Sequence, residues 1–218
     1  MTNEKISCKI LTWDDVDDLC KKLASKVSDA NYKPDMIIGL ARGGWFTARV
    51  LCDLLGVKEL VSLKVEHWGI TAQPDGKAAI KYPFQLDLKG KNVLVADDIT
   101  DTGESMKITT DYMQKMNPKS LRTGVLQHIS STSKFNPDFY GEEVDWHWYV
   151  YPWNFFEDMA NLIPKIFKEK EELTESQVNT RLKEKYNFEL KNKKLNETLS
   201  QLEKKGSLKK HGHNWKKA

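Results

Sequence analysis

Short apolar runs alternate with stretches of helical periodicity along the first two thirds of the chain. The apolar runs predict buried strands, at residues 8–11, 36–41, 60–65, 93–96, 122–127 and 146–150. Between most of these runs, apolar residues recur every three or four positions and predict helices, at residues 12–27, 48–55 and 105–116. Alternating strands and helices favour an α/β fold, in which a parallel sheet is flanked by helices on both faces.

Two segments break this pattern. Residues 66–88 show little periodicity and contain two glycines and two prolines, which predicts a long loop of the kind that covers active sites. From about residue 169, the spacing of apolar residues predicts a helix, a turn, a second helix and a short basic hairpin. We therefore expect two domains, one spanning residues 1–165 and a small, mainly helical one spanning residues 166–218.

The distribution of charge separates the same two parts. Residues 1–164 carry 19 Lys and Arg against 23 Asp and Glu, whereas residues 165–218 carry 15 against 8. The net charge is therefore −4 in the first part and +7 in the second. An excess of basic residues is typical of nucleic-acid-binding surfaces, although basic helices are also common as solvated faces. With its helices and hairpin, the basic tail is similar to a winged-helix module.

Composition also bears on the compartment. No apolar stretch approaches the roughly 20 residues that a membrane-spanning helix needs, and the first residues lack the pattern of a secretory signal. Cys8, Cys20 and Cys52 are odd in number and show no CxxC spacing, which is typical of reduced thiols in a protein core. These features predict a cytoplasmic protein without membrane contact.

The residues after the apolar run 93–96 carry the strongest chemical signal. Asp97 and Asp98 stand at the carboxyl end of this predicted strand, and a hydroxyl-rich turn, Thr100–Ser105, leads into the next helix. A helix start presents backbone N–H groups at the positive end of the helix dipole, which suits a phosphate. Two adjacent carboxylates suit Mg²⁺ or a sugar diol instead. Together these features predict a phosphorylated ribose as the ligand and Mg²⁺ as the cofactor.

A second loop is expected at the same edge of the sheet. Arg42, Gly43 and Gly44 follow the apolar run 36–41 and precede a helix. A guanidinium forms paired hydrogen bonds with a phosphate, and glycines let the backbone approach an anion closely. This tripeptide alone is more often a simple tight turn. Its position between a predicted strand and a predicted helix is what favours an anion-binding loop.

The run Val93–Ser105 resembles the phosphoribosyl diphosphate (PRPP) signature of the type I phosphoribosyltransferases. The pattern is closest to the bacterial xanthine–guanine group, in which a Trp-Asp opening, here Trp13-Asp14, a strand and a loop like Ala41–Gly44 follow in this order. The similarity covers roughly residues 10–155. It implies a type I fold with a hood, and PRPP and a purine base as the two substrates. It also implies Mg²⁺-dependent transfer to N9 of the purine, a role in purine salvage, and a homodimer.

The resemblance assigns roles to the two loops. It implies that Asp97 and Asp98 hold the ribose hydroxyls and Mg²⁺, and that Arg42 and Gly43 bind the diphosphate. It implies a 5′-phosphate cradle formed by Thr100, Asp101, Thr102, Gly103, Glu104 and Ser105. Within the cradle, Asp101 matches the acid that faces N7 of a purine, which makes it the expected catalytic residue because it can accept or share a proton. Asp101 can also serve as a helix cap.

The expected base site combines a hood with a strand end. The segment Trp148–Trp153 resembles the Trp-x-x-x-Pro-Trp hood of the family, which implies that Trp148 stacks on the purine with Tyr149 beside it. The 6-oxopurine enzymes carry a Lys at the position of His128. An ammonium group only donates hydrogen bonds, whereas a neutral imidazole donates or accepts them.

These departures bear on the substrate. His128 tolerates the amino group of adenine, and Asn154 stands where the bacterial relative has Asp. We therefore expect adenine as the base, which would give AMP, with the 6-oxopurines hypoxanthine, guanine and xanthine as the alternative.

The basic tail leaves open a second hypothesis, that the protein is a regulator and not an enzyme. A PRPP-sensing regulator could keep the fold for recognition and use the tail to bind nucleic acid. The tail could also be a dimer arm or a cap over a neighbouring active site. Asp101 and the aromatic hood favour an enzyme, because a regulator needs neither.

Overall fold

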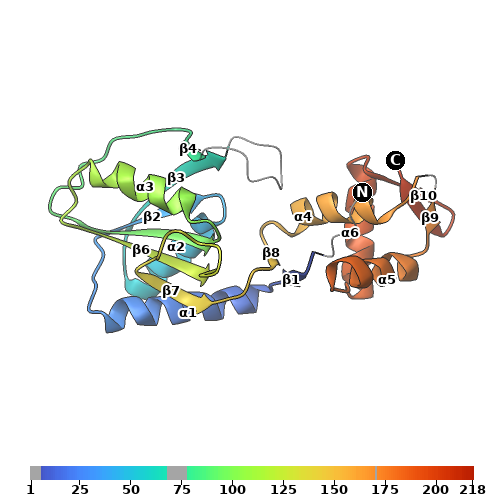
Figure 1. Ribbon diagram of the computed structural model, residues 1–218, viewed down its shortest axis with the longest axis horizontal. Helices are drawn as coiled ribbons and strands as arrows, with labels where there is room; N and C mark the ends of the chain where they lie inside the picture. Colours follow the sequence, from blue (N-terminus) through green and yellow to red (C-terminus); the bar gives the residue numbers. More distant parts are fainter. Residues whose placement is uncertain (1–5, 68–77, 170) are drawn as a thin grey trace. The chain divides into compact units, whose positions relative to one another are not determined.

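The computed structural model describes residues 6–67, 78–169 and 171–218 (Figure 1). The contacts divide the chain into two compact units. One unit, which we call the sheet unit, comprises Trp13–Trp146, and the other, the terminal unit, comprises Met1–Thr12 with His147–Ala218. Within the described residues, none of the helices has the length and apolar character required to cross a bilayer.

A six-stranded sheet forms the centre of the sheet unit, with the strand order β4-β3-β2-β5-β6-β7. Its strands are β2 (Met36–Ala41), β3 (Glu59–His67), β4 (Ala78–Ile80), β5 (Asn92–Thr100), β6 (Ser120–His128) and β7 (Phe139–Glu143). All neighbouring pairs are parallel except β3 with β4. From β2, successive strands of the chain are added toward one edge of the sheet, as β3 and β4. From β5, they are added toward the other edge, as β6 and β7. In open α/β sheets, ligands bind beyond the carboxyl ends of the strands at such a reversal point.

Helices cover the sheet on two faces (Figure 1). They are α1 (Trp13–Asp29), α2 (Gly44–Leu55) and α3 (Glu104–Gln114). Met106 and Met113 of α3 belong to one buried cluster with Ile38 and Val95 of the central strands. Helices α1 and α2 contact each other, and α2 also contacts β2 and β5. The continuous apolar runs of β2 and β5 place buried side chains on both faces, as expected for a parallel sheet covered on each side.

The α/β fold class predicted from the sequence is confirmed, with two differences in detail. Strand β7 was not expected, because Phe139–Glu143 contains no apolar run, ends in two acids and buries only Gly141. The long loop expected over residues 66–88 contains the short strand β4, and residues 68–77 lie outside the described residues.

The terminal unit joins both ends of the chain. Strand β1 (Cys8–Ile10) pairs in parallel with β8 (Trp148–Val150), so β8 does not extend the main sheet as its apolar run predicted. The remaining elements are α4 (Phe155–Leu162), the 3₁₀ helix η1 (Ile163–Ile166), β9 (Glu172–Leu173), α5 (Glu175–Tyr186), α6 (Asn192–Lys204), β10 (Leu208–His211) and β11 (Asn214–Lys217). Strands β10, β11 and β9 form an antiparallel sheet in that order.

One core holds the terminal unit together. Cys8 of β1, Val150 of β8 and Phe155 of α4 are buried in the same cluster as Leu199 of α6 and Trp215 of β11. The compact unit therefore begins at His147 and does not follow the boundary predicted at residue 165. The physical reason is that the hood segment and the tail bury their apolar side chains against each other.

Leu199→Ala tests this shared core. Leu199 is fully buried, so its truncation should destabilise the terminal unit by about 2–5 kcal/mol. In amide hydrogen exchange, β1 and β8 should lose protection together with α5 and α6, while the sheet unit keeps its protection. The matched variant Leu94→Ala, in β5, should have the reverse effect. Unchanged protection of β1 and β8 in Leu199→Ala would contradict a common core.

Candidate ligand-binding site

The candidate site lies where β2 and β5 end, at the reversal point of the sheet. Strand β2 runs into Arg42, Gly43 and the start of α2 at Gly44, while β5 runs through Asp97 and Asp98 to the turn before α3. The peptide bond between Ala41 and Arg42 is cis. Since β2 and β5 are hydrogen-bonded neighbours, the two loops that the sequence singled out emerge side by side.

The acid pair and the glycine loop touch each other. A Cβ atom on Gly43 would lie 1.7 Å from Oδ2 of Asp98, and one on Gly44 would lie 2.6 Å from the carbonyl oxygen of Ala96. The Gly44 Cβ atom would also lie 2.7 Å from Oδ1 of Asp97. A larger residue at Gly44 would collide with backbone atoms of Ala96 and Asp97, whereas one at Gly43 would collide with the side chain of Asp98. Both glycines are therefore required by the contact between the loops, in addition to any contact with a ligand.

The two carboxylates are held by backbone donors. The N–H of Asp98 donates to Oδ1 of Asp97 at 2.9 Å, and the N–H of Ile99 donates to Oδ1 of Asp98 at 2.9 Å. Burial, followed by the charge of Asp98, raises the pKa of Asp97 well above its ordinary value, although hydrogen bonds from the N–H groups of Asp98 and Gly44 act in the opposite direction. Two acids that repel each other in a half-buried site favour a proton, a cation or hydroxyl donors beside them.

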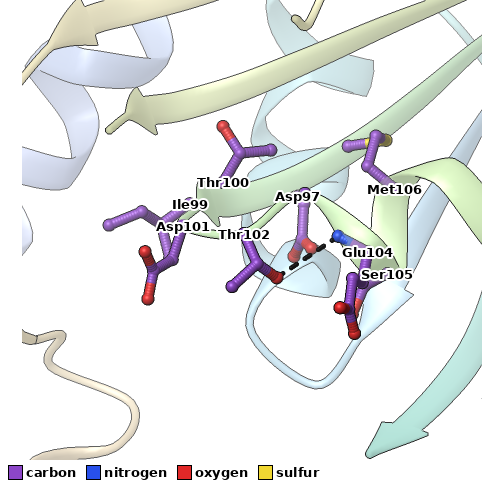
Figure 2. A pocket seen from close by; sticks show the side chains of 9 residues that line it. Asp97, Ile99, Thr100, Asp101, Thr102, Glu104, Ser105 and Met106 are labelled. Atoms are coloured by element: carbon purple, nitrogen blue, oxygen red, sulfur yellow. Dashed lines mark hydrogen bonds between the residues drawn. The ribbon is translucent and has the colours of Figure 1, made fainter. Parts of the chain in front are cut away.

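A pocket adjoins the pair at the start of α3 (Figure 2). Its volume is about 130 Å³, and its lining is Asp97, Ile99, Thr100, Asp101, Thr102, Gly103, Glu104, Ser105 and Met106. Sites that enclose a whole drug-sized ligand measure roughly 300–1,000 Å³, so this pocket fits one group of a ligand. The first turn of a helix presents backbone N–H groups that have no partner within the helix, and these bind anions. The pocket therefore suits a phosphate group.

The turn over this pocket requires glycine at one position. Gly103 adopts a left-handed conformation with φ of 79° directly before α3. A Cβ atom there would lie 2.4 Å from Cβ of Phe135. Both the backbone conformation and the close approach of Phe135 exclude a larger residue.

A segment that the sequence patterns did not single out supports this turn. Residues 129–135 follow β6, and the hydroxyl of Thr132 donates to Oδ1 of Asp101 at 2.5 Å and to its carbonyl oxygen at 3.3 Å. The N–H of Lys134 donates to the carbonyl oxygen of Thr102 at 3.0 Å. The hydroxyl run Ser130–Ser133, which follows a predicted strand, is the sequence feature that indicates this support. Its contact with the end of the neighbouring strand depends on strand order, which the local pattern does not contain.

His128 lies inside the sheet unit. Its Nδ1 is 2.8 Å from the hydroxyl of Thr100 on the adjacent strand β5. Only 4% of His128 and 3% of Thr100 are exposed. Burial lowers the pKa of His128, against the charge of Glu143, so its ring is neutral near pH 7. The Thr100 side chain, predicted to help cradle a phosphate, pairs with this imidazole, and Thr100 also lines the pocket.

Trp148 and Tyr149, the predicted hood residues, belong to the terminal unit. The indole N–H of Trp148 donates to Oδ1 of Asp158 at 3.1 Å, and its ring packs against the core of that unit. Tyr149 lies beside Lys9, whose ammonium is 5.8 Å from its ring centre. Burial raises the pKa of Asp158 to about 6, although the Trp148 hydrogen bond opposes this shift.

The predicted site residues thus fall into separate groups. The structure brings together the residues of the two loops, which are Arg42, Gly43, Asp97, Asp98, Thr100, Asp101, Thr102, Gly103, Glu104 and Ser105. Trp148 and Tyr149 come from the other compact unit. Of the lysines in the expected lid, Lys77 lies outside the described residues, and Lys81 is paired with Glu66 at 2.9 Å.

Comparison with known proteins identifies the family. The phosphoribosyl transferase domain matches residues 9–155. The chain belongs to this family. The type I phosphoribosyltransferase fold inferred from the sequence is thereby confirmed, as is the assignment to this class of enzymes. The match ends before most of the terminal unit, so the tail is not part of the family domain.

Individual relatives are similar over the same region. Hypoxanthine-guanine phosphoribosyltransferase from Aquifex aeolicus (strain VF5) is 31% identical over 144 residues, which cover 62% of this chain and 79% of that protein. The hypoxanthine-guanine phosphoribosyltransferase of Saccharomyces cerevisiae is 29% identical over 124 residues, or 48% of this chain and 54% of that protein. A crystal structure of purine phosphoribosyltransferase from Pyrococcus horikoshii Ot3 has a TM-score of 0.59 and 32% identity, and it covers 68% of this chain and 94% of that chain.

Asp97→Asn tests the electrostatic cost of the acid pair in the phosphoribosyltransferase domain. A carboxyl whose pKa is raised in the folded state favours folding while protonated, so stability is lost as the pH rises from about 3.8 through the folded-state pKa. Asparagine imitates the protonated form and keeps the oxygen that accepts the Asp98 N–H. We expect the free energy of unfolding of the sheet unit to rise by about 1 kcal/mol at pH 7 and to change little at pH 3.5.

Denaturant unfolding of both variants at the two pH values measures this change. The control is Asp53→Asn, which removes an exposed carboxylate from α2 and should have no comparable effect. A loss of stability at pH 7 in Asp97→Asn would show that the pair is not under repulsion.

Asp158→Asn tests the carboxyl that holds Trp148. Because its pKa is raised from 3.8 to about 6, the folded state retains this proton between those values and the unfolded state does not. The contribution of Asp158 to stability should therefore fall as the pH rises from 4 to 6, by about 1 kcal/mol per pH unit. The difference in amide protection of β8 and α4 between wild type and Asp158→Asn should follow this slope. A difference that is constant across this range would contradict the raised pKa.

Proposed function

We propose that this protein is a purine-salvage phosphoribosyltransferase that transfers the 5-phosphoribosyl group from PRPP to N9 of a 6-oxopurine base. The products are a nucleoside monophosphate and diphosphate. The observation that carries the proposal is the junction of the acid pair, the small pocket at the start of α3 and the Arg42–Gly44 loop. Such a junction provides for a diol, a phosphate and a diphosphate, which are the three parts of PRPP.

The charges of the site support this assignment. The helix start and hydroxyls of the pocket suit the 5′-phosphate, and Asp97 and Asp98 suit the ribose hydroxyls because carboxylates accept hydrogen bonds from them. Arg42 is exposed at the end of β2 and suits the diphosphate. Asp97, Asp101 and Glu104 also line the pocket, so a cation bound with the ligand would offset the negative charges that meet there.

Mg²⁺ fits the acid pair as a cofactor. The described residues contain no cluster of three or more His, Cys, Asp or Glu side chains that could hold a metal by themselves. Mg²⁺ usually binds through one or two carboxylates, waters and the phosphates of a substrate. Burial and then the charge of Asp98 raise the pKa of Asp97, and a cation beside the pair would offset the repulsion between the two acids. When bound, Mg²⁺ would neutralise part of the charge of the departing diphosphate.

Asp101 is the proposed proton acceptor. A purine loses a proton as N9 attacks C1′ of the ribose, and a carboxylate beside N7 stabilises the charge that develops. General-base assistance of this kind contributes roughly 10²–10⁴-fold to a rate. Asp101 is exposed at the mouth of the pocket, and the Thr132 hydroxyl bond holds its carboxylate in one orientation. Thr132 is thus a positioning residue for Asp101.

The relatives support a 6-oxopurine better than the adenine expected from His128, since two of them are named hypoxanthine-guanine phosphoribosyltransferases. The Thr100 contact offers a physical account. If the Thr100 hydroxyl donates to Nδ1 of His128, the ring proton resides on Nε2, which then donates as a lysine would. A donor at this position matches the O6 carbonyl of hypoxanthine or guanine.

A turnover panel tests the proposal. Purified protein with Mg²⁺ and PRPP is offered hypoxanthine, guanine, xanthine and adenine in parallel, and nucleotide formation is measured by chromatography. We expect turnover of hypoxanthine or guanine and little of adenine. Turnover of adenine alone would overturn the 6-oxopurine assignment. No turnover of any base while PRPP still binds would favour a PRPP-sensing regulator over an enzyme.

Asp101→Asn and Thr132→Val separate catalysis from binding. Asp101→Asn should lower kcat by about 10²-fold or more with little change in the Kd of PRPP. Thr132→Val should lower kcat less, because the carboxylate stays but loses its fixed orientation. Steady-state kinetics and calorimetric titration with PRPP measure both quantities. Equal losses in kcat and PRPP affinity would remove the catalytic role of Asp101, and Asp53→Asn serves as the surface control.

A further inference from the structure

The terminal unit contains an arrangement that the transfer reaction does not use. From α4 onward, its elements follow the order helix, strand, two helices and hairpin, which are α4, β9, α5, α6 and β10–β11 (Figure 1). This is the order of a winged-helix module. In helix-turn-helix proteins, the second helix of the pair lies in the major groove of DNA.

The helix pair is rigidly built. Leu182 of α5 and Leu199 of α6 are fully buried in the common core, so both helices direct their polar residues outward. The Asn179 side chain fixes the turn between them, because it donates to the carbonyl oxygen of Leu190 at 2.7 Å and accepts its N–H at 3.0 Å. Such a support holds α6 in one orientation relative to α5.

Several acids of the unit are neutralised within it. Glu171 forms a two-bond pair with Arg181, at 2.6 and 3.0 Å. Glu172 of β9 lies 2.9 Å from Nδ1 of His211, and this contact, ahead of others, lowers the pKa of Glu172. Glu189 pairs with Lys183 at 3.0 Å. The positive charge that remains is concentrated at the end of α6 and in the hairpin.

The hairpin carries lysines that its own fold does not require. Residues 204–218 contain six lysines and neither Asp nor Glu. Lys209 of β10 stands directly opposite Lys216 of β11, and like charges at such a pair destabilise a hairpin. Lys216 lies 3.6 Å from Glu172, whereas Lys209 forms no salt bridge with any residue that the structure describes. A partner with negative charge would turn this repulsion into attraction.

The helix and the hairpin are joined at their bases. The backbone N–H of Lys210 donates to Oε1 of Glu203 at 3.2 Å, which ties β10 to α6. On the outer surface of α6, exposed polar residues recur every three or four positions, at Lys193, Glu197, Ser200 and Lys204. These positions share one side of the helix, which therefore carries two lysines and one acid.

We propose that α6 and the β10–β11 hairpin form a binding surface for duplex DNA. A single α-helix fits the major groove, and Asn192 and Lys193 at the start of α6 are residue types that hydrogen-bond base edges there. Lys209 and Lys217 would neutralise backbone phosphates flanking the groove. The proposal is independent of the transfer reaction, because none of these residues belongs to the sheet unit.

Fluorescence anisotropy of the full-length protein with a labelled duplex of about 24 base pairs tests the proposal, at salt concentrations from about 50 to 200 mM. We expect binding that weakens steeply with salt. The double variant Lys209→Ala/Lys217→Ala should weaken binding and reduce the slope of log K against log salt by about 2, because each lost phosphate contact reduces it by roughly 1. Its phosphoribosyl transfer rate should equal that of wild type.

The control Lys22→Ala/Lys115→Ala removes the same charge from exposed positions of the sheet unit. It should leave the affinity and the slope unchanged. An equal loss in the control would mean unspecific attraction and would overturn the proposal. Absence of duplex binding at 50 mM salt, or tighter binding of a single-stranded RNA of the same length, would overturn it as well.

Discussion

The site depends on the close contact between two adjacent carboxylates and the backbone of a glycine loop. Gly44 lies so near Asp97 and the Ala96 carbonyl that a Cβ atom would overlap them, and Gly43 lies equally near Asp98. The half-buried acids are held by backbone N–H groups, and burial, followed by the charge of Asp98, raises the pKa of Asp97. Holding two acids close together lowers the stability of the fold, and the same arrangement favours binding of a cation and of hydroxyl groups.

The remaining parts of the site follow from the topology of the sheet. Because the strand order reverses between β2 and β5, the loops after these strands emerge next to each other without a covering helix between them. The neighbouring strand β6 then brings the hydroxyl segment 129–135 against the turn before α3, where Thr132 orients Asp101. Three strand ends thus form one binding edge, and each supplies a different chemical group.

The division into two compact units assigns separate roles to the parts of the chain. The sheet unit contains the family domain almost entirely and all residues of the acid pair, the pocket and the glycine loop. The terminal unit uses the first strand, the hood segment and the tail to bury one core. The basic residues of α6 and the hairpin lie on the outer surface of this unit, and none of them belongs to the acid pair, the pocket or the glycine loop.

The sequence by itself determined the α/β class, the strand and loop that carry Asp97–Ser105, and the Arg42–Gly44 loop, because local patterns of apolar, acidic and glycine residues specify them. Only the tertiary structure decided the rest. The pairing of β8 with β1, the Thr132 bond to Asp101 and the burial of His128 against Thr100 are contacts between distant segments. Periodicity describes which face of an element is apolar, but not which other element covers it, so these features follow from packing alone.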